Sequence, residues 1–309
     1  MKHLVVATRR WAAGALAFVL MPLCAVAQEL EPGAYWPIPK NLNIVTAVNN
    51  FNWGDLAFDP TLPIDEASAR INTTAFAFTR AFSFAGRSAQ VSVMVPVVAG
   101  HLEGSYLGTV AEADRFGLAD PRVRLAMNLY GAPAMTLREF AAYQQRAIVG
   151  VSVTVAPPLG QYDSTKLINL GTHRWSIKPE IGLSRSYGQW IVEMMAGVWV
   201  FTDNTDFFGG RTRTQDPIVA TQGHLTYRFK SSKSSMWLAA DANFFTGGQT
   251  TLGGTENLDF QRNSRVGATL SRTVGGGQAI RVSVSRGAYT TIGADFISVA
   301  GSYSYAWAR

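Results

Sequence analysis

Residues 173–201 of the chain read HRWSIKPEIGLSRSYGQWIVEMMAGVWVF. From Arg174 to Ser186 every second residue is charged, polar or glycine, whereas the residues between them are mainly apolar, including Trp175 and Ile181. The alternation resumes after Gly188, where one parity carries Val192, Met194, Ala196, Val198 and Val200. Two alternating runs joined by a tight turn predict a β-hairpin with one apolar and one polar face.

The same period of two recurs along almost the whole chain. It predicts twelve strands, at 42–58, 68–85, 88–99, 118–130, 143–157, 172–187, 189–203, 216–229, 234–247, 258–273, 278–290 and 294–308. Long and tight connections alternate between these strands, and only the medium-length 131–142 and the short 291–293 depart from that order. Short turns at one end, long loops at the other and an even number of strands are typical of outer-membrane barrels. The expected fold is therefore all-β, an antiparallel transmembrane outer-membrane β-barrel of about 12 strands.

The first 27 residues have the pattern of a secretory signal peptide. Lys2, Arg9 and Arg10 precede an uncharged run at 11–23, and Ala25-Val26-Ala27 provides a cleavage site. The run is shorter than the ~20 residues that a membrane-spanning helix needs, and no apolar run of that length follows it. We therefore predict a signal peptide at 1–27, a single barrel domain at 28–309 and a location in the outer membrane.

Composition limits the classes of partner. The only cysteine, Cys24, lies in the expected signal peptide, so the mature domain has no disulfide. Loss of the three basic residues in that peptide lowers the formal net charge from +6 to +3, which gives no reason to expect nucleic-acid binding. The partners expected of an outer-membrane barrel are membrane lipid and lipopolysaccharide, a small-molecule solute, and the barrel-assembly machinery during insertion.

The polar parity of the strands predicts which residues line the inside of the barrel. They are Arg122, Arg124, Arg146, Arg174, Lys178, Glu180, Glu193, Arg228, Asp241, Arg265 and Arg281. Eight bases against three acids predict an interior that attracts carboxylates or phenolates. The alternative is that these charges form salt bridges that fill the inside, because twelve strands lie between packed 8-stranded barrels and open 16-stranded porins.

Aromatic residues near strand ends fit the girdles that mark the membrane interfaces. The candidates are Tyr130, Trp175, Tyr187, Trp190, Trp237 and Phe296. The strand at 68–85 is ambiguous, because Phe76 and Phe78 share a parity with Arg80. The pattern does not decide which of its faces meets lipid.

Two prolines and one loop raise further expectations. Pro96 and Pro179 lie inside expected strands of a closed sheet, so we expect a bulge or a local break in pairing at each, and a lateral opening there stays an open question. The loop at 157–171 either constricts the mouth or forms an ordered cap, with Asp163 capping the backbone.

No cofactor, metal or catalytic residue is expected. His101, His173 and His224 are scattered, and the glycine-rich pieces at 246–254 and 274–278 lack the lysine of a phosphate-binding loop. His173 and Ser176 would point to opposite faces of one strand, so they cannot form a nucleophile–base pair within it.

Four phrases of the chain resemble the bacterial family described as transporters of the MetA pathway of phenol degradation. They are GRSAQVSVMVPVVAG (86–100), GLADPRVRLAMNLYG (117–131), VSVTVAPPLGQYDSTKLINLGTHRWSIKPEIGLSRSYGQW (151–190) and TQGHLTYRF (221–229), and the third is the most specific. The resemblance spans roughly residues 40–309 and implies an outer-membrane barrel that transports aromatic compounds. It implies no particular catalytic or binding residue.

The function expected from the sequence is uptake of small, aromatic or anionic solutes through an outer-membrane channel. One alternative is a structural or surface-interaction barrel with a closed interior. Another is a lipid-modifying outer-membrane enzyme, which would require a partner for His173 or Ser176 on a neighbouring strand.

Overall fold

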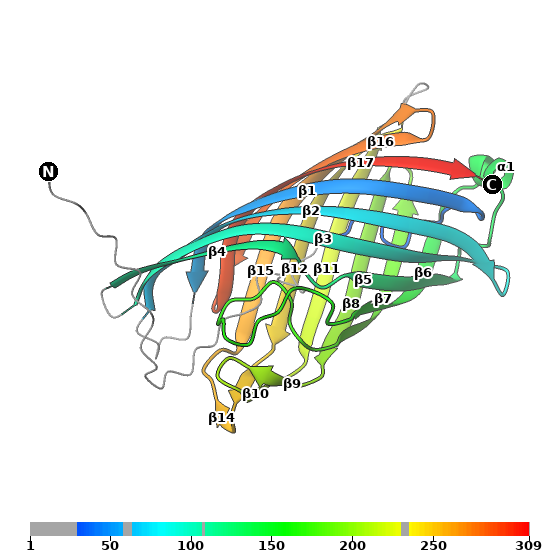
Figure 1. The fold of residues 1–309 in the computed structure, drawn as a ribbon. Helices are drawn as coiled ribbons and strands as arrows, with labels where there is room; N and C mark the ends of the chain where they lie inside the picture. Colours follow the sequence, from blue (N-terminus) through cyan, green and yellow to red (C-terminus); the bar gives the residue numbers. More distant parts are fainter. Residues whose placement is uncertain (1–29, 58–63, 107–108, 230–234, 309) are drawn as a thin grey trace, which may run out of the picture.

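The structure is a computed structural model that describes residues 30–57, 64–106, 109–229 and 235–308. The expected signal peptide, with Cys24, and the tight connection at 230–233 lie outside the described residues. Twelve antiparallel strands form a closed ring, in which the last strand pairs with the first (Figure 1). In order around the ring they are β1 (Leu42–Ala57), β2 (Ile64–Phe84), β3 (Arg87–Tyr106), β5 (Arg122–Tyr130), β6 (Ala147–Ala156), β7 (Ser176–Tyr187), β8 (Trp190–Phe201), β11 (Ile218–Phe229), β12 (Met236–Gly247), β15 (Gln261–Gly275), β16 (Gln278–Tyr289) and β17 (Gly293–Ala308). The expected all-β fold and its twelve strands are confirmed.

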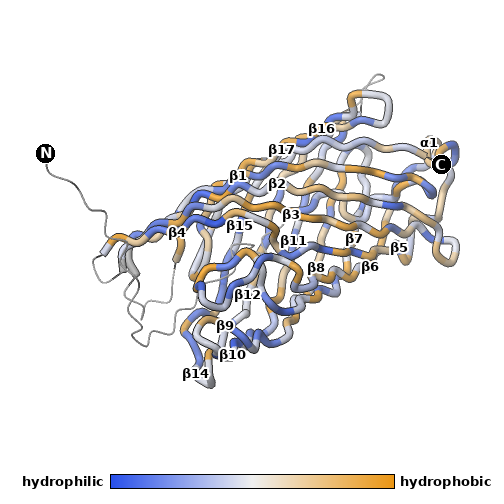
Figure 2. The backbone as a smooth tube through the Cα atoms, viewed as in Figure 1, coloured by the Kyte–Doolittle hydropathy of each residue, from blue (hydrophilic) through white to orange (hydrophobic). Residues whose placement is uncertain are grey.

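Hydrophobic and hydrophilic residues alternate along the strands (Figure 2), and buried and exposed side chains alternate with them as the sequence pattern predicts. In β7 the side chains of Ile181 and Leu183 are exposed on the outer face, whereas Lys178, Glu180 and Ser184 are buried on the inner face. A closed ring pairs the backbone and places the apolar parity outside, where a barrel contacts lipid.

The ambiguous strand also acquires a definite orientation. Phe76 and Phe78 of β2 are exposed on the outer face, and Ala75 and Ala81 are buried on the inner face. Arg80 therefore lies on the outer face too, next to the end of β1, where its guanidinium donates to the side-chain oxygen of Asn43 at 2.7 Å. Arg80, which made the sequence pattern ambiguous, therefore lies at the rim of the barrel.

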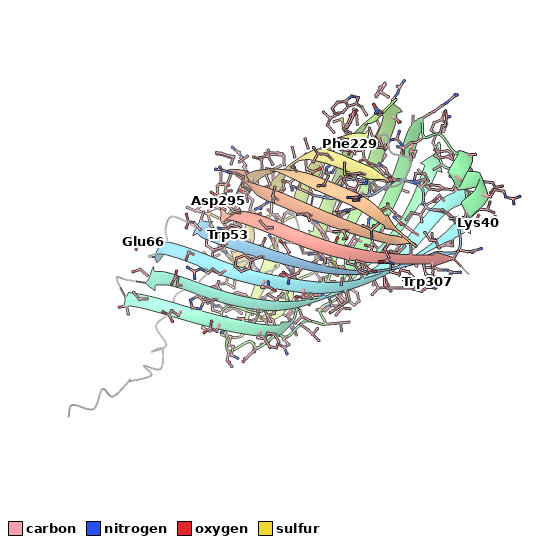
Figure 3. All side chains as sticks on the ribbon, turned by 90° about the horizontal axis from the view of Figure 1, so that it is seen from above. Lys40, Trp53, Glu66, Phe229, Asp295 and Trp307 are labelled. Carbon is pink, nitrogen blue, oxygen red and sulfur yellow. The ribbon has the colours of Figure 1, made fainter. Side chains whose placement is uncertain are left out.

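The two ends of the barrel differ. At the loop end, Trp53, Glu66 and Asp295 lie near the long connections (Figure 3). At the turn end, Lys40 lies close to the helix α1 (Leu137–Ala142), and Trp307 lies at the same end of the barrel. This helix occupies the medium-length connection at 131–142. No described helix is both long and apolar enough to cross a membrane.

The expectation of a loop at 100–117 was wrong. Strand β3 continues to Tyr106, and β4 (Thr109–Leu118) pairs with it over Val97–Tyr106, beyond the part of β3 that pairs with β5 (Figure 1). The hairpin has polar residues on both faces, as expected of strands that project past the lipid, so it lacks the alternation on which the assignment relied.

Four more strands lie in segments that were expected to be loops. They are β9 (Asn204–Phe207), β10 (Arg211–Gln215), β13 (Thr250–Leu252) and β14 (Thr255–Glu256), and they form a sheet in the order β14-β13-β10-β9. We call this sheet the small sheet. The small sheet is formed by the connections that follow β8 and β12, and it lies at the loop end (Figure 1).

At Pro179 the pairing is interrupted on one side only. The ladder with β8 omits Lys178 and Pro179 without a change of register, while Pro179 keeps its partner Val153 on β6. Pro96 keeps its partner on β2, and on its other side the pairing changes from β5 to β4.

The loop at 157–171 is an ordered cap at the mouth. Asp163 accepts the backbone N–H of Thr165 at 3.0 Å, which confirms the expected capping role. The N–H of Gln161 donates to the carbonyl of Leu118 at 2.8 Å, and the guanidinium of Arg115 donates to the carbonyl of Ile168 at 2.6 Å. These bonds attach the loop to β4.

Two of the expected girdle residues are on the inner face. Four of the six candidates are exposed, namely Tyr130, Trp175, Tyr187 and Trp190. The other two, Trp237 and Phe296, are buried. Phe296 belongs to an inner apolar cluster at the loop end, together with Ala69, Ile71, Val98, Leu102, Ala119 and Leu170. Aromatic character alone does not distinguish lipid-facing residues from residues that fill the inside.

Candidate functional site: the barrel interior

The segment before β1 lies inside the barrel. We call residues 30–41 the inner segment; its backbone bonds to side chains on strands far along the chain. The N–H of Glu31 donates to the side-chain oxygen of Gln222 at 3.1 Å, and the N–H of Gly33 donates to a carboxylate oxygen of Glu193 at 3.0 Å. Polar residues of the inner wall thus satisfy the backbone of a segment that has no strand partner.

Tyr35 anchors the inner segment against β6 and β7. A Cβ added at Gly150 or Gly182 would come within 2.2 Å of its ring, so the two glycines leave the space that the ring occupies. The phenol oxygen is 3.0 Å from the hydroxyl of Ser152 and donates to a carboxylate oxygen of Glu180 at 3.0 Å. Ring and hydroxyl are therefore both accommodated by the wall.

Glu180 is also the centre of an ion-pair group. Its carboxylate lies 3.0 Å from the ammonium of Lys178 and 3.7 Å from the guanidinium of Arg124. The ammonium of Lys178 is 5.3 Å from the centre of the Trp199 ring, and the guanidinium of Arg124 is 5.1 Å from the centre of the Tyr35 ring. These three charges therefore form salt bridges inside the barrel, as the alternative to an anion-attracting lumen predicted.

A second polar group lies on β11, β12 and β15. The ring nitrogen Nδ1 of His224 is 2.7 Å from a carboxylate oxygen of Asp241, whose other oxygen accepts the hydroxyl of Thr269 at 2.6 Å. All three side chains are buried. The arrangement fixes the orientation of the imidazole on the inner wall.

Arg281 and Arg265 lie on the inner face of the neighbouring strands. The guanidinium of Arg281 is 5.1 Å from the centre of the Trp237 ring, which in turn packs edge-on against Trp36 of the inner segment at 5.4 Å. Arg265 is buried and donates to the carbonyl of Phe296 at 2.9 Å. Arg265 therefore ties strands together, whereas Arg281 remains accessible to solvent.

The remaining predicted basic residues are spread over the length of the barrel. Arg122 begins β5 and is half-buried, and Arg174 is buried at the loop end just before β7. Arg228 lies near the turn end, where it donates to the hydroxyl of Ser186 at 2.8 Å. The expectation that Arg146 lines the lumen is wrong. Arg146 has the parity of the inner face, but it lies just before the start of β6 and is exposed at the turn end.

No sequence pattern predicts that the inner segment lies in the lumen. Tyr35, Glu31 and Gly33 precede the first alternating run, and a segment without periodicity carries no indication of what it contacts. The described residues contain no group of three or more histidine, cysteine, aspartate and glutamate side chains that could hold a metal ion.

Comparisons with known proteins agree with this architecture. A family profile described as "Putative MetA-pathway of phenol degradation" matches residues 60–292. The crystal structure of the COG4313 outer membrane channel from Pseudomonas putida F1 is similar with a TM-score of 0.75 and 18% identity, covering 90% of this chain and 100% of that one. The β domain of the Bordetella autotransporter BrkA is similar with a TM-score of 0.52 and 10% identity, covering 86% of this chain and 99% of that one. A sequence comparison with curated proteins finds no match.

Proposed function

Because the chain belongs to the family of the MetA pathway of phenol degradation, we propose that it is an outer-membrane channel for small aromatic or anionic solutes. The observation that carries the proposal is a closed barrel with charged residues on its inner face and apolar residues on its outer face. The structurally similar protein from Pseudomonas putida F1 is itself an outer membrane channel.

The proposal includes the route to the membrane. Residues 1–27 act as a signal peptide, and the barrel-assembly machinery inserts the domain that follows. Both described termini of the barrel lie at the turn end, which then faces the periplasm, and the loop end faces outward, as is usual for such barrels. The exposed apolar parity contacts lipid, and the outer rim contacts lipopolysaccharide.

The chemistry of the solute follows from Arg281, the predicted lumen arginine that is accessible to solvent beside an aromatic ring. Glu180 neutralises Lys178 and Arg124 in part, and the carboxylates of Glu31, Asp241 and Glu193 act on Arg281 from beyond salt-bridge distance. A solvent-accessible guanidinium next to Trp237 and Trp36 suits an aromatic ring that carries a negative charge. Benzoate-type anions and phenolates have this combination.

Single-channel conductance in a planar bilayer tests the function. The refolded mature chain should give steps that are anion-selective in a salt gradient and that benzoate blocks. Arg281→Gln should reduce the anion selectivity, whereas Arg286→Gln, on the outer face of the same strand, should leave it unchanged. Equal effects of the two substitutions would contradict the assignment of the inner face as the solute path.

The inner segment favours one competing function, a barrel with a closed interior that serves a structural or surface role. Such a barrel would be silent in the bilayer while retaining the heat-modifiable migration of a folded barrel. The lipid-modifying enzyme has less support, because exposed His173 stacks on Tyr162 at 4.6 Å and buried Ser176 lies on the other face. Loss of a lipid-cleaving activity on Ser176→Ala would be needed to restore that alternative.

A further inference from the structure

Two arginines are buried where the small sheet meets the end of the barrel. Arg174 precedes β7 and is 4% exposed, and Arg213 lies on β10 and is 5% exposed. Both belong to segments outside the membrane-spanning ring. Neither is within salt-bridge distance of a carboxylate among the described residues, although a buried cation is ordinarily paired.

Most of their N–H groups lack an acceptor. Nε and Nη1 of Arg174 and Nε and Nη2 of Arg213 are buried without a hydrogen-bond partner. Three acids act on them from beyond salt-bridge distance: Asp120 and Asp203 on Arg174, and Asp259 on Arg213. Asp120 accepts from Gly160 and Thr172, and Asp259 accepts from Thr250. Both guanidiniums therefore have buried N–H groups to which an anion could bind.

The two cations lie close enough to repel each other. Nη2 of Arg174 donates to the side-chain oxygen of Gln215, which is two residues from Arg213 on the same face of β10. Burial lowers the pKa of Arg174 well below its ordinary value, and the like charge of Arg213 lowers it further. An anion between them would relieve both the desolvation and the repulsion.

An apolar and aromatic cluster lies behind Arg174. The guanidinium of Arg174 is 4.3 Å from the centre of the Phe201 ring. Phe201 packs against the buried cluster of Trp199, Ile218, Ala220 and Phe245. The guanidinium of Arg213 is 5.5 Å from the centre of another ring, Phe207. Two cationic donors that each lie against an aromatic ring complement a ligand with a carboxylate at one end and a flat apolar body.

We propose that Arg174 and Arg213 form a binding site for a small aromatic carboxylate at the outer mouth of the barrel. The carboxylate takes the place of the Gln215 oxygen on Arg174 and bonds to the unpartnered N–H groups of both arginines. The inference rests on the proposed function, since it locates where the channel first captures its solute.

Calorimetric titration of the full mature chain in detergent with benzoate tests the site. One benzoate per barrel should bind, and Arg174→Met and Arg213→Met should each weaken binding at least about tenfold, the cost of one charge-assisted pair. Benzyl alcohol should not bind, and Arg286→Gln should bind as the parent does. Binding that survives both methionine substitutions, or benzyl alcohol binding as tightly as benzoate, would overturn the proposal, and so would phosphate binding at this site in preference to benzoate.

A second variant keeps both arginines and avoids the risk of misfolding. Gln215→Glu places a carboxylate of the chain itself on Arg174, so it should abolish benzoate binding and raise the unfolding temperature in the absence of ligand. Benzoate should raise the unfolding temperature of the parent chain but not that of Gln215→Glu. Undiminished affinity in this variant would rule out the site.

The outcomes separate the site from the channel. Benzoate binding without conductance would preserve the site and refute the proposed function. Conductance without benzoate binding, in a folded barrel, would refute the site and preserve the function.

Discussion

At the scale of single residues, the ring of Tyr35 fills a space that two absent side chains leave on the wall. Gly150 on β6 and Gly182 on β7 face each other across the ladder, and both face the ring. Neither has a positive φ, so the glycines are required by the ring and not by the backbone. The wall and the inner segment are thus fitted to each other.

Gly182→Ala should displace the inner segment. Its methyl group would come within 2.2 Å of the Tyr35 ring, so the variant should lose ~1–3 kcal/mol of stability, as overpacked sites do, and should conduct more. Gly223→Ala is the matched control, because its nearest neighbour would be 3.9 Å away. Urea unfolding and bilayer conductance measure the two effects, and identical behaviour of both variants would show that the ring does not depend on this space.

The parity of a strand predicted which face a charge occupies, but not which partner it meets. Lys178 and Glu180 were assigned correctly to the inner face because a period of two fixes the orientation of a side chain. The pairing of Glu180 with Tyr35 could not be foreseen, since Tyr35 belongs to a segment without periodicity. The proximity of Arg174 to Arg213 depends on the position of β10, and no local sequence pattern predicts the order of the strands in the small sheet.

At the scale of elements, Asp120 holds the cap loop to the place where β4 gives way to β5. One carboxylate oxygen accepts the N–H of Gly160 at 2.8 Å, and the other accepts the N–H and the hydroxyl of Thr172 at 2.8 and 2.7 Å. A single side chain in the connection between β4 and β5 therefore bonds to Gly160 and Thr172, which lie at the two ends of the loop at 157–171.

Asp120→Asn should loosen the cap loop. An amide offers one acceptor oxygen in place of two, so at least one backbone donor loses its partner, at a cost of ~1–3 kcal/mol. Hydrogen exchange at Gly160 and Thr172 should become faster while the barrel strands stay protected. Asp114→Asn, whose carboxylate bonds to exposed His101, is the control, and unchanged exchange at both loop residues would contradict the role of Asp120.

Strands inside the membrane and strands beyond it differ in how well a sequence predicts them. β7 and β8 were placed to within a few residues because lipid on one side imposes the alternation. β4 and the small sheet stand in water at the loop end, where Val110 and Phe116 can be exposed and polar residues can face either way. No alternation is required there, so these strands were taken for loops.

At the scale of the whole molecule, the barrel and its inner segment form one charged interior. Glu31 adds a fourth acid to the three predicted on the strands. Its backbone N–H donates to the side chain of Gln222, and the backbone N–H of Gly33 donates to the carboxylate of Glu193. The closed ring was predictable because its strands repeat one rule. Its content was not, because the segment that fills it obeys no repeat.

Deletion of residues 31–38 should therefore change both the size and the selectivity of the pathway. It removes Tyr35 and Trp36 from the lumen and takes away the Glu31 carboxylate, while Arg124, Lys178 and Arg281 remain on the wall. Conductance should rise, and the reversal potential in a salt gradient should shift toward that of a more anion-selective pore. Glu31→Gln in the full chain separates the two effects, because it should shift the reversal potential with little change in conductance. If the deletion leaves a folded barrel with unchanged conductance, the ions do not pass the inner segment and the solute path lies elsewhere in the ring.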